Sequence, residues 1–167
     1  MKATYNEIFI SNQILSNIPT VMEGRKMPAS TVTTILLHRL AHQRKMEEYE
    51  EACRKALDEL KKDEKYSDFD SRIQAHEEAK SKGNEYDKEF DKIVDGLTEA
   101  YSDVRRKQAQ VTTEVEIQPM TRKELDDIVD VVGTEGTITI SHAAGCFEQE
   151  RIQFLGMLTN YFTRQSR

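Results

Sequence analysis

A run of small and apolar residues, spaced alternately four and three positions apart, limits most strongly how this chain can fold. The run consists of Ala79, Gly83, Tyr86, Phe90, Ile93, Leu97, Ala100 and Val104. This spacing places all of these side chains on one side of an α-helix, as in the seam of a coiled coil. A helix with such a seam needs a second apolar helix to bury it. The pattern therefore predicts a mainly helical protein.

A matching helix is predicted earlier in the chain, over residues 30–62. Apolar residues recur there at helical spacing, at Val32, Ile35, Leu36, Leu40, Met46, Tyr49, Cys53, Ala56 and Leu60. One continuous helix of this extent would be about 50 Å long. The polar residues 61–71 between the two seams are typical of a turn. The two helices are therefore predicted to fold back on each other as a long antiparallel hairpin.

Folding the helices about position 68 predicts which residues meet across the hairpin. Leu40 would lie near Leu97, and Met46 near Phe90. The predicted hairpin core is Leu36, Leu40, Met46, Tyr49, Cys53, Leu60, Tyr86, Phe90, Ile93, Leu97, Tyr101 and Val104. An alternative keeps the hairpin but leaves residues 63–83 as an irregular loop and begins the second helix after Asn84, because glycine costs about 1 kcal/mol inside a helix.

Further apolar residues lie outside the two seams and exceed what one antiparallel partner would bury. They are Leu37, Leu57, Ile73 and Val94. Helices of about 50 Å also overrun a compact body of this chain length, whose radius of gyration should be about 15 Å. Part of the hairpin is therefore expected to project, and these four residues are candidate contacts with another protein.

The hairpin is flanked by a shorter helix at the N-terminus and a small mixed module at the C-terminus. Thr4 with Glu7 forms a capping-box pattern that predicts a helix over about residues 5–17, and residues 20–28 read as a loop. The alternation in residues 111–117 predicts a half-buried strand, and Thr121 with Glu124 predicts a short helix that ends at Gly133. A second strand, residues 137–140, and a last helix over about residues 141–162 complete the module.

The predicted fold class is therefore mainly α, with a long antiparallel helical hairpin and a small α+β C-terminal module. Residues 1–110 would form the N-terminal helix and the hairpin. Residues 111–167 would form a strand–helix–strand–helix module packed on the base of the hairpin.

Two histidine-containing pairs are candidate sites of chemistry. His38 and His42 lie four residues apart, but Arg39 replaces the glutamate of the zinc-protease motif, and one pair lacks the three or four ligands of a zinc site. His142 and Cys146 also lie four apart, so a helix could bring imidazole and thiol together. No third catalytic group accompanies them, and cysteine is commonly a small buried apolar residue. No catalytic, metal or cofactor site is predicted, and the chain is expected not to be an enzyme.

Charge and hydropathy exclude further classes of function. The net charge is −6, and only residues 1–43 are net basic, with 4 basic and 2 acidic side chains, so no general nucleic-acid binding is expected. No apolar run approaches the ~18–20 residues that span a membrane, and the polar N-terminus is unlike a signal peptide. Both cysteines are expected to be reduced.

The order of short motifs resembles a family of short tailed-bacteriophage proteins that has no assigned activity. The opening M-K-x-T-x-x-E-I corresponds to Met1, Lys2, Thr4, Glu7 and Ile8; a Lys-Met-Pro step follows at Lys26, Met27 and Pro28; and an E-V-E-I strand at residues 114–117 precedes a short helix around Leu125. The similarity covers residues 1–60 and 85–130, while the tail from residue 133 departs from the pattern. The resemblance implies a phage origin, and hence a location in the host cytoplasm and incorporation into the virion.

Three functions are compatible with these features. The leading hypothesis is a non-enzymatic bacteriophage structural or assembly protein that contacts itself or other phage proteins through its helices. The alternative is an acidic phage inhibitor of a host defence or nucleic-acid enzyme. A third hypothesis is a cysteine-dependent enzyme at Cys146.

Overall fold

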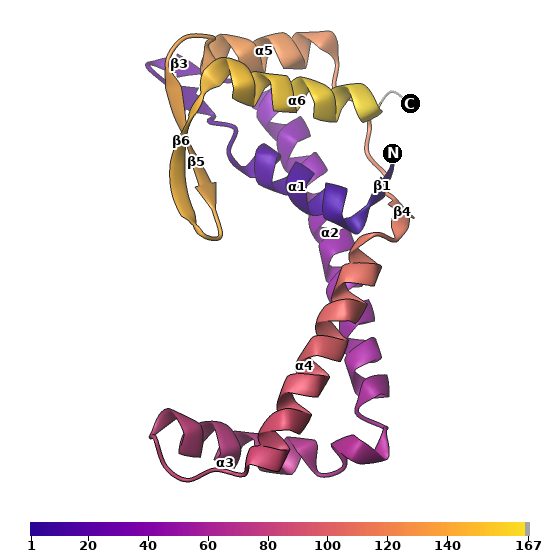
Figure 1. The fold of residues 1–167 in the computed structure, drawn as a ribbon. Coiled ribbons are helices and arrows are strands. Elements are labelled where there is room, and N and C mark those ends of the chain that lie inside the picture. Colours follow the sequence, from indigo (N-terminus) through magenta and orange to yellow (C-terminus); the bar gives the residue numbers. More distant parts are fainter. Residues whose placement is uncertain (166–167) are drawn as a thin grey trace. The chain divides into compact units, whose positions relative to one another are not determined.

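The computed structural model describes residues 1–165, with side chains through residue 163, and is mainly helical with small antiparallel sheets (Figure 1). In chain order the elements are β1 (Lys2–Thr4), α1 (Tyr5–Ser16), β2 (Val21–Met22), β3 (Arg25–Lys26), α2 (Ala29–Leu60), the 3-10 helix η1 (Glu64–Tyr66), α3 (Phe69–Ser81), α4 (Lys88–Ala109), β4 (Thr112–Glu114), α5 (Arg122–Val132), β5 (Thr137–His142), β6 (Gly145–Glu150) and α6 (Arg151–Gln165). The mainly α class and the long first helix of the predicted hairpin are thereby confirmed.

The chain divides into two compact units. The first unit contains residues 1–47 together with the chain from residue 112 onward, and the second contains residues 48–111. Helix α2 contributes to both units. This division differs from the predicted one at residue 110, because α1 and the first half of α2 belong with the C-terminal elements.

The first unit has its core where α1, α5, α6 and the β5–β6 pair meet. The buried side chains are Leu15, Ile18, Met27, Ile35, Met120, Ile128, Val131, Val132, Ile138, Ile140, Phe154, Leu155, Leu158, Tyr161 and Phe162. Burying a side chain such as Phe154, which is fully inaccessible, stabilises the unit by about 1.5–3 kcal/mol. Residues from both ends of the sequence therefore share one core.

Both predicted capping boxes are present. The hydroxyl of Thr4 accepts from the main-chain N–H of Glu7, whose carboxylate accepts from the N–H of Thr4, and α1 begins there. Thr121 and Glu124 make the same pair of bonds at the start of α5. Helix α5 ends at Gly133 as predicted, with φ at +73°.

The strand predicted over residues 111–117 is shorter in the structure. Only β4 pairs, antiparallel to β1, with Ala3 opposite Thr113. The terminal amino group of Met1 donates to the carbonyl of Val115, at 2.9 Å, and the Val115 N–H donates back to Met1 at 2.8 Å. Two segments more than a hundred residues apart are thereby joined at the edge of the unit.

The last predicted helix begins too early. Residues 137–150 form the antiparallel strands β5 and β6, and α6 begins only at Arg151. His142 and Cys146 therefore lie on opposite strands of a hairpin. Their spacing of four does not place them on one side of a helix. Phe147, in β6, is 50% exposed. The alternation of residues 137–140 indicates the first strand, but no alternation follows in residues 141–150, so the sequence pattern does not indicate β6.

The second unit departs from the predicted continuous seam between residues 79 and 104. Helix α3 ends at Ser81, Gly83 adopts φ of +68°, and α4 begins after Asp87, whose carboxylate caps the N–H groups of Glu89 and Phe90. The predicted irregular loop with an Asn84 cap is also wrong, because residues 69–81 are helical. The left-handed glycine interrupts the seam, and Asp87 rather than Asn84 caps α4.

Phe90 is the main anchor of the second unit. Its ring is 2% exposed, and the rings of Phe69 and His76, both in α3, lie 5.7 and 5.1 Å away between centroids. The guanidinium of Arg72 lies over the same ring at 4.1 Å. Phe90 is thus a core residue as predicted, and its aromatic contacts within the second unit are with α3.

Contacts between the later part of α2 and α4 follow a different register from the predicted one. The Tyr49 hydroxyl donates to the carbonyl of Arg105 at 3.2 Å, and the Arg105 guanidinium pairs with Glu50 at 2.8 Å. The predicted folding point would instead have placed a residue near position 87 opposite Tyr49. Helix α3 and the two segments that flank it connect α2 to α4. The residue of α4 opposite Tyr49 is therefore Arg105, later in the sequence than predicted.

The other predicted core residues fall into three groups. Tyr49, Cys53, Phe90 and Leu97 are buried, whereas Met46, Leu60, Tyr86, Ile93, Tyr101 and Val104 are partly buried. Leu36 and Leu40 are 54% and 45% exposed, so their assignment to the core is wrong. The buried side of α2 in the first unit is formed by Thr31, Ile35, His38 and His42. This side is offset by about one residue from the predicted side, which included Leu36 and Leu40.

Candidate functional site

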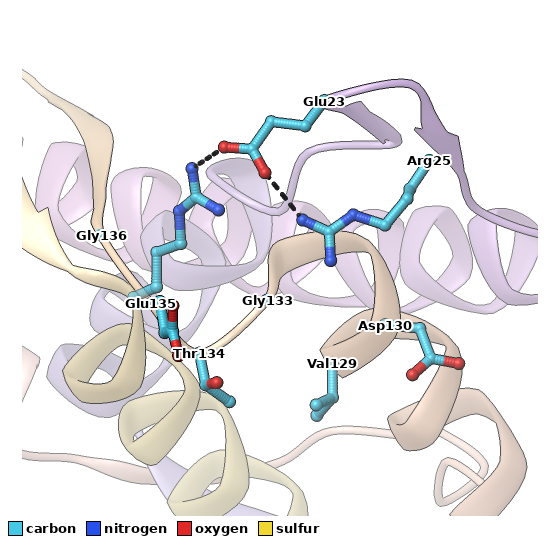
Figure 2. A pocket seen from close by; sticks show the side chains of 9 residues that line it. Glu23, Arg25, Val129, Asp130, Gly133, Thr134, Glu135 and Gly136 are labelled. Carbon is cyan, nitrogen blue, oxygen red and sulfur yellow. Dashed lines mark hydrogen bonds and ion pairs between the residues drawn. The ribbon is translucent and has the colours of Figure 1, made fainter.

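A polar hollow of about 670 Å³ lies in the first unit, where the β2–β3 turn faces the end of α5 and the start of α6 (Figure 2). Its lining is Glu23, Arg25, Val129, Asp130, Gly133, Thr134, Glu135, Gly136 and Arg151. Glu23 and Gly24 form the turn, with φ of +51° and +80°, as a two-residue hairpin turn requires. The turn directs the Glu23 carboxylate over the hollow.

Arg151 is the central side chain of this hollow. It is 9% exposed, and its guanidinium donates to the carbonyls of Thr137, at 3.0 Å, and Val132, at 3.2 Å. It also pairs with Glu23, which pairs on its other side with Arg25 at 2.9 Å. The hydrogen bond from Arg151 lowers the pKa of the Glu23 carboxyl, and the charges of Arg151 and Arg25 add to this effect.

The side chains of the hollow connect the β2–β3 turn to the α5–β5 connection and to α6. A Cβ at Gly133 would lie 3.1 Å from the Arg25 guanidinium, and the φ of +73° there already disfavours other residues. Glu23 offsets one of the two arginine charges, and Asp130 and Glu135 bring the net charge of the lining to −1. An anionic ligand is therefore not favoured. The arrangement fastens the β2–β3 turn to the α5–β5 connection and α6.

Two histidines and a tyrosine form a buried polar cluster in the same unit. Tyr161 places its hydroxyl 3.2 Å from Nδ1 of His38 and 3.4 Å from Nε2 of His42. The other ring nitrogens face main-chain carbonyls, with His38 Nε2 2.8 Å from Gln118 O and His42 Nδ1 2.6 Å from His38 O. A ring nitrogen that faces a carbonyl must carry the hydrogen, because a carbonyl oxygen only accepts hydrogen bonds. In each neutral ring the other nitrogen, which carries no hydrogen, therefore faces the tyrosine hydroxyl.

Burial lowers the pKa of both His38 and His42, and the hydrogen bonds to main-chain carbonyls only partly oppose that shift. The two side chains are 2% and 0% exposed. They are therefore neutral at pH 7 and closed to a substrate, and the cluster specifies packing between α2 and α6. The sequence identified these residues as a pair but not their burial.

Two threonines of α2 bind acidic residues of α5 and hold the same side of the helix in place. The Thr31 hydroxyl donates to Asp127 at 2.6 Å, and the Thr34 hydroxyl donates to Glu124 at 2.5 Å. These bonds lower the pKa of both carboxyls. The orientation of α2 in the first unit, and hence the side that it presents to solvent, follows from these contacts.

The solvent side of α2 carries three exposed leucines, which we name the leucine surface: Leu36, Leu37 and Leu40. Their exposed fractions are 54%, 59% and 45%. Beside them lies a groove of about 380 Å³, whose lining includes Leu37, Leu40, Ala41 and Ile117. Of the predicted contact residues, Leu37 is thus exposed, whereas Leu57, Ile73 and Val94 are partly buried in the second unit.

His142 and Cys146 do not form a catalytic arrangement. His142 Nδ1 accepts from the main-chain N–H of Ala144 at 3.1 Å, which occupies it within the hairpin turn. Cys146 is exposed and lies 3.7 Å from the Ser141 hydroxyl. Cys53, in contrast, is fully buried.

The polar hollow was missed at the level of sequence, because Glu23 and Arg151 are 128 positions apart. Within residues 1–165, no three His, Cys, Asp or Glu side chains are grouped so that they could hold a metal ion. No helix in this part of the chain has the length and apolar character needed to cross a membrane.

Comparisons with protein families, with curated proteins and with solved structures gave no match to this chain.

Proposed function

We propose that the protein is a non-enzymatic bacteriophage structural or assembly protein that acts through helix-mediated contacts with itself or with other phage proteins. The observation that carries the proposal is the leucine surface of α2. Three leucines, each about half exposed, lie within five positions of one helix. Exposed apolar groups of this kind usually mark contact sites.

The surroundings of the leucine surface support a contact with another helix. The adjacent groove of about 380 Å³ offers room for side chains of a partner, and Arg44 and Glu116 on its lining supply opposite charges at the rim. Protein interfaces commonly combine an apolar centre with a polar rim. A helix packed here would bury leucines that this chain leaves in water.

In the second unit, we propose that the later part of α2 and α4 act as two arms of a helical hairpin with α3 at its tip. The Tyr49 and Glu50 contacts to Arg105 support this arrangement. Leu57, Ile73 and Val94 would then contribute a secondary contact at the edges of the arms.

The sites of action are the host cytoplasm and the virion, with no membrane or general nucleic-acid binding.

The test uses Leu37→Lys together with Ile152→Lys as a matched control. Ile152 is 55% exposed on α6 and lies outside the leucine surface. Gel filtration with light scattering should show an assembly for the natural protein and the control, weakened about tenfold or more by Leu37→Lys. Mass spectrometry of purified virions is the companion measurement. A strict monomer that is also absent from virions would contradict the proposal.

A second candidate function is an acidic phage inhibitor of a host defence or nucleic-acid enzyme. It is favoured by the charge of residues 48–111, which hold 18 acidic and 13 basic side chains, a net charge of −5 within a total of −6. Such a unit could occupy a basic surface. Co-purification of a host enzyme from infected cells, lost above about 0.5 M salt, would support this function over the first.

A further inference from the structure

The β5–β6 pair has one blocked edge and one open edge. Asn17, at the end of α1, accepts from the N–H of Ser141 at 2.7 Å and donates to the Ser141 carbonyl at 3.1 Å. The amide of Asn17 therefore takes the place of a neighbouring strand at Ser141 of β5. Among residues 1–165, no strand pairs with the other edge, that of β6.

The register shows which groups that open edge offers. Ser141 lies opposite Cys146, and because Ser141 directs its N–H and carbonyl toward Asn17, this pair is of the non-hydrogen-bonded type. The main-chain groups of Cys146, and of Glu148 two residues later, therefore point away from β5. They form a short row of donors and acceptors that an added strand could pair.

An apolar groove lies beneath this edge, on the side of the sheet that carries Phe147 and Gln149. The groove lies between α1, the two strands and α6, and measures about 240 Å³. This is about eight times the ~30 Å³ that a water molecule occupies in the liquid, so one large side chain fits. Ile10 and Phe147 stand at its rim, each 50% exposed.

One polar atom indicates which side chain suits the groove. The side-chain carbonyl oxygen of Gln149 is buried and accepts no hydrogen bond from the described part of the chain. A buried acceptor without a donor is unfavourable, so an occupant that supplies one is preferred. Tyrosine and tryptophan combine a large apolar body with a single donor.

Charge on the opposite side of the sheet indicates the rest of the occupant. Glu148 and Glu150 alternate along β6 on the side away from the groove, and neither β5 nor β6 contains a lysine or arginine. A second copy of β6 would bring glutamate against glutamate across the new pair, which is destabilising. A strand with lysine or arginine at alternate positions would meet opposite charge instead.

We propose that the β6 edge binds an extended segment of a partner protein, in which basic residues alternate with apolar ones and one tyrosine or tryptophan enters the groove. The main chain of the segment pairs with Cys146 and Glu148, and its basic residues lie opposite Glu148 and Glu150. This surface is separate from the leucine surface, so it does not depend on helix-mediated contact.

The test measures binding of the full chain to the fluorescein-labelled peptide KVKYKVK by fluorescence anisotropy. We expect saturable binding below about 1 mM, weaker by about fivefold for KVKFKVK, which lacks the hydroxyl, and by about tenfold or more for EVEYEVE. No saturation by about 1 mM, or equal affinity for the charge-reversed peptide, would overturn the proposal.

Four variants locate the binding. Glu148→Pro removes an outward N–H that β5 does not use, and should abolish binding while the circular dichroism spectrum is retained. Glu148→Gln should weaken binding about threefold, and Gln149→Leu should remove the preference for tyrosine over phenylalanine. Ile10→Lys, at an exposed rim position of α1, should weaken binding even if the proline variant fails to fold.

The leucine surface provides the control. Leu37→Lys should leave peptide binding unchanged while it weakens assembly, so the two proposals fail separately. Unchanged affinity in both Ile10→Lys and Glu148→Gln would refute the edge-binding site.

Discussion

Acidification from about pH 7.5 to pH 5.5 should destabilise the first unit through His38 and His42. In the folded protein burial lowers the pKa of both rings below the usual 6.5, whereas in the unfolded chain they titrate near that value. The unfolded state therefore binds more protons as the pH falls below about 6.5. Stability is fully present above this pH and is lost progressively below it, down to the folded pKa values.

The magnitude follows from the number of rings that remain neutral. A histidine that stays uncharged in the fold, while its unfolded form protonates, costs up to about 1.4 kcal/mol per pH unit below 6.5. For two such rings the loss at pH 5.5 approaches about 3 kcal/mol. A typical domain has a free energy of unfolding of only 5–15 kcal/mol, so the effect is measurable. Carboxylates contribute little, because they titrate in the unfolded state near pH 4.

Urea titrations at several pH values, followed by circular dichroism, measure this loss directly. Proton NMR of the imidazole rings assigns it, since the signals of His38 and His42 should not titrate near pH 6.5. A His142→Gln variant, which removes an exposed ring, should keep the same pH dependence. Equal free energies of unfolding at pH 7.5 and 5.5 would show that the two buried rings are not held neutral by the fold.

Three further changes test the packing of Phe90, the hydrogen bonds of Arg151 and the catalytic hypothesis for Cys146. Phe90→Ala should lower the free energy of unfolding of the second unit by about 3–5 kcal/mol, whereas Lys92→Ala should change it by no more than ~0.5, and equal urea midpoints would contradict the aromatic anchor. Arg151→Met leaves two main-chain carbonyls without their donor and should cost about 2–4 kcal/mol, against less than ~1 for Arg25→Met, as measured by thermal unfolding. Cys146→Ser should leave stability and partner binding unchanged, and a loss of binding with an unchanged far-ultraviolet spectrum would revive the catalytic hypothesis.

Features set by neighbouring residues could be predicted from the sequence. The starts of α1 and α5 follow from Thr4 with Glu7 and Thr121 with Glu124, because a capping box needs only four consecutive residues. The extent of α2 follows from an uninterrupted run without proline or glycine. The exposure of Leu37 is consistent with the excess of apolar residues over what one partner helix could bury.

Features that join distant residues were decided only by the tertiary structure. Helix α2 has apolar residues on more than one side, so periodicity could not tell that Ile35 and His38 face inward while Leu36 faces water. That choice depends on the threonine bonds to α5 and on Tyr161, from the other end of the chain. The pairing of Glu23 with Arg151 likewise has no local signal. Sequence spacing reports the direction of side chains within one element, whereas partners across elements are selected by packing and hydrogen bonding of the whole unit.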